Sequence, residues 1–173
     1  TMRLGKPNTY TLGTVVSSGT LYVNNTSGSG TGTGAVTVNG GILGGTGIIT
    51  GAVTVNGGGT ISPGTASSIG TLTLASSPTL SGVTSVKINR NGGAFLADKL
   101  IRSGGALNYG GTLVVGNIGA ALVGGEIFTN FSANSYSGAF ASMTLPSLSA
   151  GMNWYTNRLL VNGTLKVNRS PIA

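Results

Sequence analysis

GAVTVNGG stands at residues 34–41 and is repeated without change at residues 51–58, 17 positions further along the chain. The aligned copies, GAVTVNGGILGGTGIIT (34–50) and GAVTVNGGGTISPGTAS (51–67), show the same order of features. Each has an alternating three-residue run, an Asn-Gly turn, and two short apolar segments separated by a glycine-rich turn. An internal repeat of this kind is typical of a protein built from stacked structural units.

Apolar and polar residues alternate in the repeat and in many other short runs. The alternation is clear in VTV (36–38), in TLTL (71–74), and in the stretches that surround Lys87 and Lys166. Successive side chains of a β-strand point to opposite faces, so each run has one apolar face and one face of Thr or Lys. No segment shows a helical period. The tripeptide Gly-Thr-Leu opens four of the predicted strands, at 19–23, 70–74, 111–115 and 163–167.

The repeat predicts an all-β fold in which the chain winds as a single-stranded β-solenoid, or β-helix. Strands of three to five residues are too short to form stable hairpins alone. A unit of roughly 17–20 residues can instead form one rung, with the next rung stacked at about 4.8 Å. Equivalent residues of the two copies would then lie on one another: Val36 on Val53, Val38 on Val55, and Asn39 on Asn56 in an amide ladder.

The regularity of the repeats divides the chain into two sections of one predicted domain. Residues 1–82 carry the regular repeats and an N-terminal strand, and residues 83–173 read as an irregular continuation with a C-terminal cap. The second section holds most of the aromatic side chains: Phe128, Phe131, Tyr136, Phe140, Trp154 and Tyr155. Large rings can close the end of a tube as a capping core, or they can stack on sugar rings if exposed. The sequence favours the capping core.

The charge balance suggests which partners the protein would attract. Two acids stand against nine basic residues, which gives a net charge of +7. The basic residues are dispersed: Arg3, Lys6, Lys87, Arg90, Lys99, Arg102, Arg158, Lys166 and Arg169. This indicates a mild bias toward anionic partners such as polysaccharide, lipopolysaccharide or extracellular DNA. The chain has no Cys and no apolar run of about 20 residues, so it suits an exterior location and lacks a membrane-spanning helix.

The amino-acid composition argues against most kinds of catalytic and metal site. Hydrolysis of a glycosidic bond usually needs two carboxyl groups, and Asp98 and Glu126 are the only acids. Asp98, beside Lys99, reads as part of a structural ion pair or turn. Calcium sites use several carboxylates, and the absence of His and Cys removes zinc sites and His-based nucleophile systems. GSGTGTG (28–34) lacks the Lys of a phosphate-binding loop. We therefore assign no catalytic, cofactor or metal residues and expect no enzyme.

Nearly the whole chain resembles a known family of secreted proteins. NTYTLGTVVSSGTLYVNNTSGSGTGTGAVTVNGG (8–41) resembles the autotransporter-associated β-strand repeat, although Leu12 and Val15 depart from its usual pattern. GGTISPGTASSIGTLTL (58–74), YSGAF (136–140) and LPSLSAGMNW (145–154) are also similar to that family. The resemblance implies a right-handed β-solenoid in an extracellular surface protein of a Gram-negative bacterium. It also implies that the chain is a passenger segment or a free exported relative.

Two functions follow from these expectations. The first is a structural, extracellular surface protein whose copies join head-to-tail into a fibre or adhesive filament. A solenoid end is an unpaired sheet edge that can accept another chain, and a contact that does not close propagates into a filament. In this interpretation a neighbouring copy holds the N-terminal segment Thr1–Tyr10 and the C-terminal segment Asn168–Ala173, and deletion of Thr1–Lys6 weakens polymerisation. The alternative is a monomeric autotransporter-type passenger or adhesin module that binds anionic polysaccharide or matrix.

Overall fold

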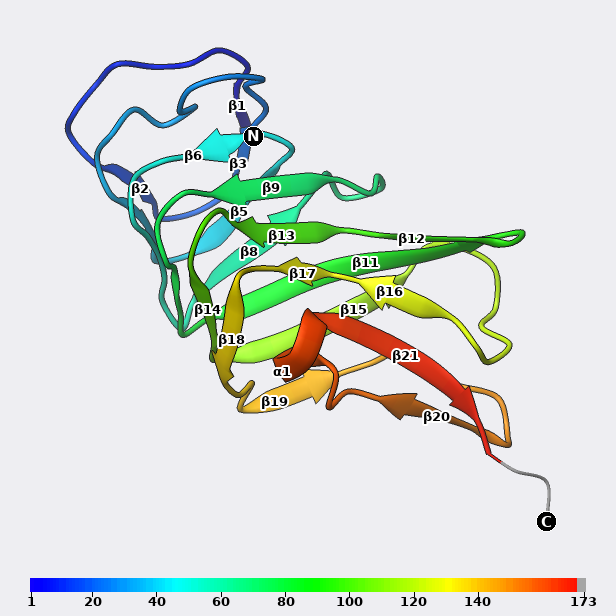
Figure 1. The fold of residues 1–173 in the computed structure, drawn as a ribbon. Helices are drawn as coiled ribbons and strands as arrows, with labels where there is room; N and C mark the ends of the chain where they lie inside the picture. The colour runs from blue at the N-terminus through cyan, green and yellow to red at the C-terminus, as the bar shows by residue number, and fades with distance from the viewer. Residues whose placement is uncertain (171–173) are drawn as a thin grey trace.

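The computed structural model describes residues 1–170 and is nearly all β (Figure 1). Its single helix, α1 (Leu159–Asn162), has four residues. The strands form four parallel sheets, named A to D below, and one antiparallel sheet, E. Only one strand of the parallel set, β12, runs antiparallel to its neighbour. The all-β prediction is therefore confirmed.

Sheet A extends over the whole length of the molecule. Its strands follow one another in the order β1 (Met2–Leu4), β3 (Thr20–Val23), β5 (Gly41–Gly45), β8 (Gly59–Pro63), β11 (Val83–Asn91), β15 (Thr112–Asn117) and β19 (Ser142–Thr144). All of these pairs are parallel, and β12 (Ala94–Ala97) folds back on β11 as a hairpin. The sheet crosses the boundary between residues 82 and 83, because β11 pairs with β8 as well as with β15.

Three shorter parallel sheets accompany sheet A. Sheet B consists of β2 (Thr14–Val16), β4 (Val36–Val38), β7 (Val53–Val55) and β10 (Thr79–Leu80). Sheet C consists of β6 (Ile48–Ile49), β9 (Thr71–Leu74), β13 (Lys99–Arg102) and β17 (Phe131–Ser132). Sheet D consists of β14 (Ala106–Tyr109) and β18 (Ser135–Gly138).

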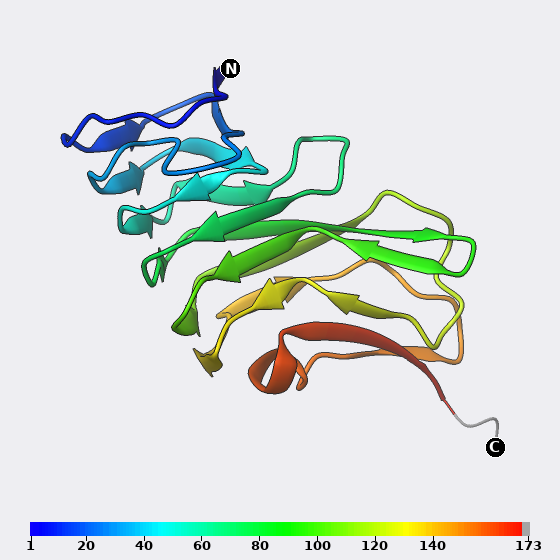
Figure 2. The same cartoon turned by 45° about the horizontal axis from the view of Figure 1, so that its top comes forward.

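The chain visits these sheets in a repeating circuit. It passes through β6, β7 and β8, which belong to sheets C, B and A, and then through β9, β10 and β11 in the same order. In the next two circuits, sheet D takes the place of sheet B: β13, β14 and β15 are followed by β17, β18 and β19. Figure 2 shows these turns of the ribbon layered from the N-terminus to the C-terminus. Each of these four circuits thus adds one parallel strand to three of the sheets, whereas the chain before β6 contributes strands to sheets A and B alone.

The register of the doubled sequence is the predicted one. Val36 pairs with Val53 and Val38 with Val55, and all four valines are buried. Beside them, Asn56 Nδ2 donates a hydrogen bond to Asn39 Oδ1 over 2.7 Å. The valine stack and the amide ladder are therefore confirmed.

The length of the circuit differs from the prediction in the second half of the chain. Leu43 pairs with Ile61, and this separation along the chain lies within the predicted range. Thr84 instead pairs with Leu113, and Leu113 pairs with Met143, so these later circuits are considerably longer. The prediction is wrong for both. The nine-residue β11 and its hairpin with β12 lengthen the first of these circuits, and the segment 118–126 together with β16 (Ile127–Thr129) lengthens the second.

The repeat opens with glycine because adjacent circuits touch there through their backbones. A Cβ atom on Gly51 would lie far inside van der Waals contact with the carbonyl oxygen of Gly34, the equivalent glycine one circuit earlier. At Gly41 the reason is conformational as well, since its φ is +77°, in the region that side chains other than glycine rarely adopt.

The C-terminal section departs from the parallel pattern. Sheet E joins β16 (Ile127–Thr129), β21 (Thr164–Arg169) and β20 (Met152–Tyr155) in antiparallel pairs. The Gly-Thr-Leu run at 163–167 thus contributes to this antiparallel sheet, whereas the runs at 19–23 and 111–115 contribute to sheet A. The helix α1 packs against β17, β18 and β21. The division at residue 82 stays a prediction.

The N-terminal strand is held by its own chain. Met2 and Leu4 of β1 pair with Leu21 and Val23 of β3. Part of the segment Thr1–Tyr10 is thus held within the chain, and its contact with a neighbouring copy stays a prediction. In the segment 168–173, Arg169 pairs with Met152 of the same chain, while residues 171–173 lie outside the described residues.

Candidate functional site

Asp98 lies fully buried between sheets A and C. Its Oδ2 is 2.5 Å from Lys87 Nζ, and its two carboxylate oxygens accept the backbone N–H groups of Gly70 and Lys87, each over 2.8 Å. Burial raises the pKa of Asp98, and the contacts with Lys87 and the two amides oppose this rise. The predicted structural ion pair exists, but the partner of Asp98 is Lys87 and not Lys99.

The Lys87–Asp98 pair connects strands from several circuits of the chain. Lys87 Nζ also donates to the carbonyl oxygen of Pro63 over 3.0 Å, and Asn130 Nδ2 donates to the carbonyl oxygen of Asp98 over 3.0 Å. The alternation around Lys87 puts this side chain on the face opposite Val86 and Ile88, yet that face is also buried here. Asp98 and Pro63 cover the lysine, and only 7% of its surface is exposed.

Glu126, the second acid, is also buried and engaged. Its carboxylate accepts the backbone N–H groups of Val123 and Gly124 over 2.8 and 2.9 Å, and Arg90 Nε lies 3.4 Å from it. Each acid thus has its own cation and its own pair of backbone donors. The structure gives the two carboxylates separate structural surroundings and does not expose either of them to a substrate.

The surface charge of the described residues is entirely cationic as a result. Two of the nine basic residues, Lys87 and Arg90, neutralise the two acids. The other seven form no salt bridge within residues 1–170: Arg3, Lys6, Lys99, Arg102, Arg158, Lys166 and Arg169. The sequence predicts the net charge, but not that the acids are withdrawn from the surface.

Two of these cations lie on a face that also exposes aromatic rings. Lys99 lines a hollow of about 240 Å³ together with Phe95, Leu96 and Ile127. Lys166 of β21 is paired with Ile127 on one side and with Tyr155 on the other, so these three side chains share one side of sheet E. Phe95 and Tyr155 are exposed. We call the set of Phe95, Lys99, Ile127, Tyr155 and Lys166 the basic-aromatic face.

Five of the six rings that the sequence assigns to a capping core lie in the core or pack against it. The sixth, Tyr155, is exposed, and the prediction is wrong for that ring. Phe128 and Phe131 are fully buried, and Phe140 is nearly so. Tyr109 joins this cluster, with its ring centroid 5.1 Å from that of Phe131 and 4.8 Å from that of Phe140. Its Oη donates to the carbonyl oxygen of Leu159 in α1 over 3.0 Å, and burial raises its pKa. Sequence reasoning missed Tyr109, because its place in the cluster depends on the pairing of β14 with β18.

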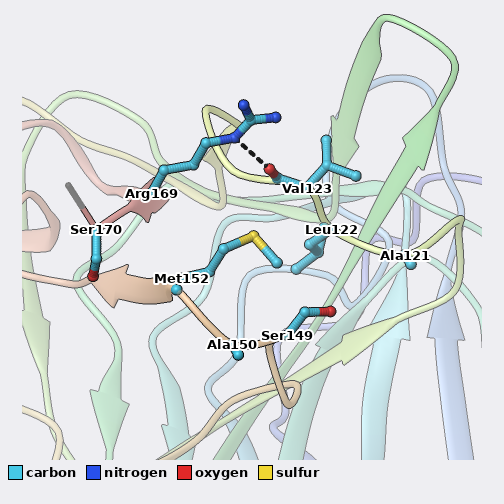
Figure 3. A pocket seen from close by; sticks show the side chains of 9 residues that line it. Ala121, Leu122, Val123, Ser149, Ala150, Met152, Arg169 and Ser170 are labelled. Atoms are coloured by element: carbon cyan, nitrogen blue, oxygen red, sulfur yellow. Dashed lines mark hydrogen bonds between the residues drawn. The ribbon is translucent and has the colours of Figure 1, made fainter. Parts of the chain in front are cut away.

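A hollow of about 450 Å³ lies beside the C-terminal strand (Figure 3). Segments 121–123 and 149–152 line it together with Arg169 and Ser170. Arg169 Nε donates to the carbonyl oxygen of Val123 over 2.9 Å. Arg169 is the only ionisable side chain among the lining residues, so they supply neither a general base nor a carboxylate pair.

The two ends of sheet A are open. The outer edges of β1 and β19 have no strand partner among the described residues. Apolar side chains are exposed near both edges: Met2 and Val15 share a hollow near β1, and Met143 and Leu160 share one near β19. An open edge with exposed apolar side chains is a place where another chain can add a strand.

Within residues 1–170, no three His, Cys, Asp or Glu side chains gather as a metal site would require. The one helix of the described chain is far too short to cross a membrane. No protein-family model matches the chain, and neither a curated protein sequence nor a solved structure is significantly similar to it. The resemblance to the autotransporter-associated β-strand repeat therefore rests on the sequence motifs alone.

Proposed function

We propose that the repeating circuit of strands forms a β-solenoid and that this solenoid is a structural, fibre-forming surface protein. The circuit through sheets C, B and A, and the stacking of equivalent valines, support a solenoid. Crossovers between parallel strands of one sheet are almost always right-handed, which favours a right-handed coil. We propose no catalytic role, because both carboxylates are buried in ion pairs and the residues that line the 450 Å³ hollow include no general base.

The observation that carries the fibre proposal is the pair of open, parallel edges of sheet A. All seven strands on the main path of this sheet run parallel, so the edge strands β1 and β19 point the same way. One copy placed after another along the sheet would continue the same parallel pairing. Such a head-to-tail contact does not close, and it therefore propagates. The motifs shared with autotransporter repeats and the lack of Cys support an extracellular location on a bacterial surface.

Purified protein should form filaments one molecule wide, visible by negative-stain electron microscopy. Fibre growth should be faster in about 500 mM salt than in about 20 mM salt, because the copies carry charge of the same sign and repel each other less when screened. Light scattering measures the growth rate. Short rods of one molecule in both salts, with a monomer mass in sedimentation, would contradict the fibre proposal and favour a monomeric passenger.

The basic-aromatic face favours a second function, binding to an anionic polysaccharide or matrix. Lysines at positions 99 and 166 can attract the anionic groups, and the exposed rings of Phe95 and Tyr155 can pack on sugar rings. No acidic side chain of the described chain is exposed to repel such a polymer.

The protein should be retained on immobilised heparin, used as a polysaccharide probe, in about 20 mM salt and released in about 500 mM salt. This dependence on salt is opposite to that of fibre growth, so the two functions can be separated. The double variant Lys99→Gln/Lys166→Gln should elute at lower salt than the control Arg3→Gln/Lys6→Gln, which removes the same charge elsewhere. Equal elution of the two variants would show diffuse attraction and would argue against a binding face.

A further inference from the structure

One column of side chains runs through sheet A from the first strand to the last. Each member is paired in register with the next, and the column reads Met2, Leu21, Leu43, Ile61, Thr84, Leu113 and Met143. The five inner members are buried, with at most 5% of their surface exposed. The two terminal methionines are 61% and 42% exposed.

The exposure of the methionines follows from their position and not from the direction of their side chains. In a parallel sheet, residues paired in register place their side chains on the same face. Met2 and Met143 therefore belong to the inner, apolar face, as their buried partners Leu21 and Leu113 do. Each remains partly exposed because no further strand of the described residues pairs with its outer side. Met2 and Met143 thus lie on the core face at the two ends of sheet A, where no further strand of the described chain continues the stack.

Each terminal methionine also lines a shallow hollow to which apolar side chains contribute. Met2 shares one of about 270 Å³ with Val15, Val16 and Leu21. Met143 shares another of about 170 Å³ with Phe140, Leu159 and Leu160. At this second end, α1 packs on the last strands of sheets C and D, whereas the outer edge of β19 stays unpaired among the described residues.

We propose that the joint between copies in the fibre is a parallel pairing of β19 of one copy with β1 of the next, with Met143 packed on Met2. This inference rests on the proposed fibre. Both edge strands have three residues, and the parallel direction and the apolar column continue across the joint without interruption.

The occupant of each edge is a second copy because the edges of a single chain cannot meet. β1 and β19 lie at opposite ends of sheet A, separated by five strands, and Figures 1 and 2 show the N-terminal and C-terminal turns at opposite ends of the stack. The charge near the joint, from Arg3 and Lys6 on one side and Arg158 on the other, is all positive. Contact at this joint is thus driven by apolar packing and edge hydrogen bonds, and opposed by charge.

The test uses the absence of cysteine from the natural chain. The double variant Met2→Cys/Met143→Cys, assembled and then oxidised, should give a ladder of dimers, trimers and longer species on a non-reducing gel, because each joint brings the two cysteines together. Both positions are exposed in a single copy, so the substitutions should leave its fold unchanged. The control Met2→Cys/Leu96→Cys, whose second cysteine lies on the exposed hairpin strand β12, should give no ladder beyond dimers.

Filaments with no ladder, or with the same pattern as the control, would overturn this joint and leave the fibre proposal standing. Wild-type protein that forms no filaments would overturn both. Strong dimer formation by Met2→Cys alone would indicate a symmetric head-to-head contact and would also overturn the joint. As a second measurement, Met143→Lys should reduce the rate of filament growth at least about tenfold, because it places a charge in the apolar contact. Leu96→Lys should leave the rate unchanged, and equal rates for both variants would count against the joint.

Discussion

Replacing Asp98 with Ala should lower the free energy of unfolding by about 3–5 kcal/mol, the usual cost of removing one partner from a buried ion pair. The change leaves the Lys87 ammonium group without its carboxylate. It also deprives the backbone N–H groups of Gly70 and Lys87 of their acceptor. Denaturant unfolding followed by circular dichroism measures the loss.

Two further variants show which contacts of Asp98 matter. Lys87→Met should cost less than Asp98→Ala, because the carboxylate would keep its two backbone donors. The double variant should cost less than the sum of the two single variants, since it leaves neither charge buried alone. Lys99→Met is the matched control: it removes the lysine next to Asp98 in sequence, which forms no salt bridge within the described chain, and it should change stability by less than about 0.5 kcal/mol. A loss as large as that of Lys87→Met would show that Lys99 is the real partner.

Replacing Gly51 with Ala should destabilise the stack by about 3 kcal/mol or more, and should reduce the yield of folded protein. The added Cβ would collide with the carbonyl oxygen of Gly34, and a backbone atom cannot move aside without separating the two circuits. Gly57→Ala is a close control from the same repeat. A Cβ at Gly57 would meet nothing within 4 Å, and the φ of Gly57 is not positive.

The comparison of the two variants tests the backbone contact directly. Gly57→Ala should change the stability by less than about 0.5 kcal/mol. If both variants lose stability equally, the sensitivity lies in glycine's flexibility and not in the contact between Gly51 and Gly34. If neither loses stability, the close stacking of the two circuits is wrong.

The strand register of residues 34–41 on 51–58 could be predicted from the sequence because the two copies are identical. Two identical strands stack most favourably with identical residues paired, so Val36 finds Val53 and Asn39 finds Asn56. Alternation then decides which side chains face the core, and the large rings of Phe128 and Phe131 follow the same rule. In this part of the fold, local pattern and tertiary packing require the same arrangement.

The same reasoning failed where the circuits differ in length. Thr84 and Leu113 are paired across one of the long circuits, and no repeated motif marks their separation along the chain. The Gly-Thr-Leu runs show how weak a short motif is, because the run at 163–167 lies in an antiparallel sheet and the run at 111–115 in a parallel one. A three-residue pattern predicts a strand, but it does not specify the partner of that strand.

The sequence by itself determined the all-β class, the stacking of residues 34–41 on 51–58, and the excess of positive charge. Those features depend on composition and on short-range periodicity, and both are properties of the sequence itself. Only the tertiary structure decided that Asp98 pairs with Lys87, that both acids leave the surface, and that Met2 and Met143 end one continuous column. These relations join residues on different circuits, and the length of each circuit is set by how hairpins and loops pack, which no local pattern encodes.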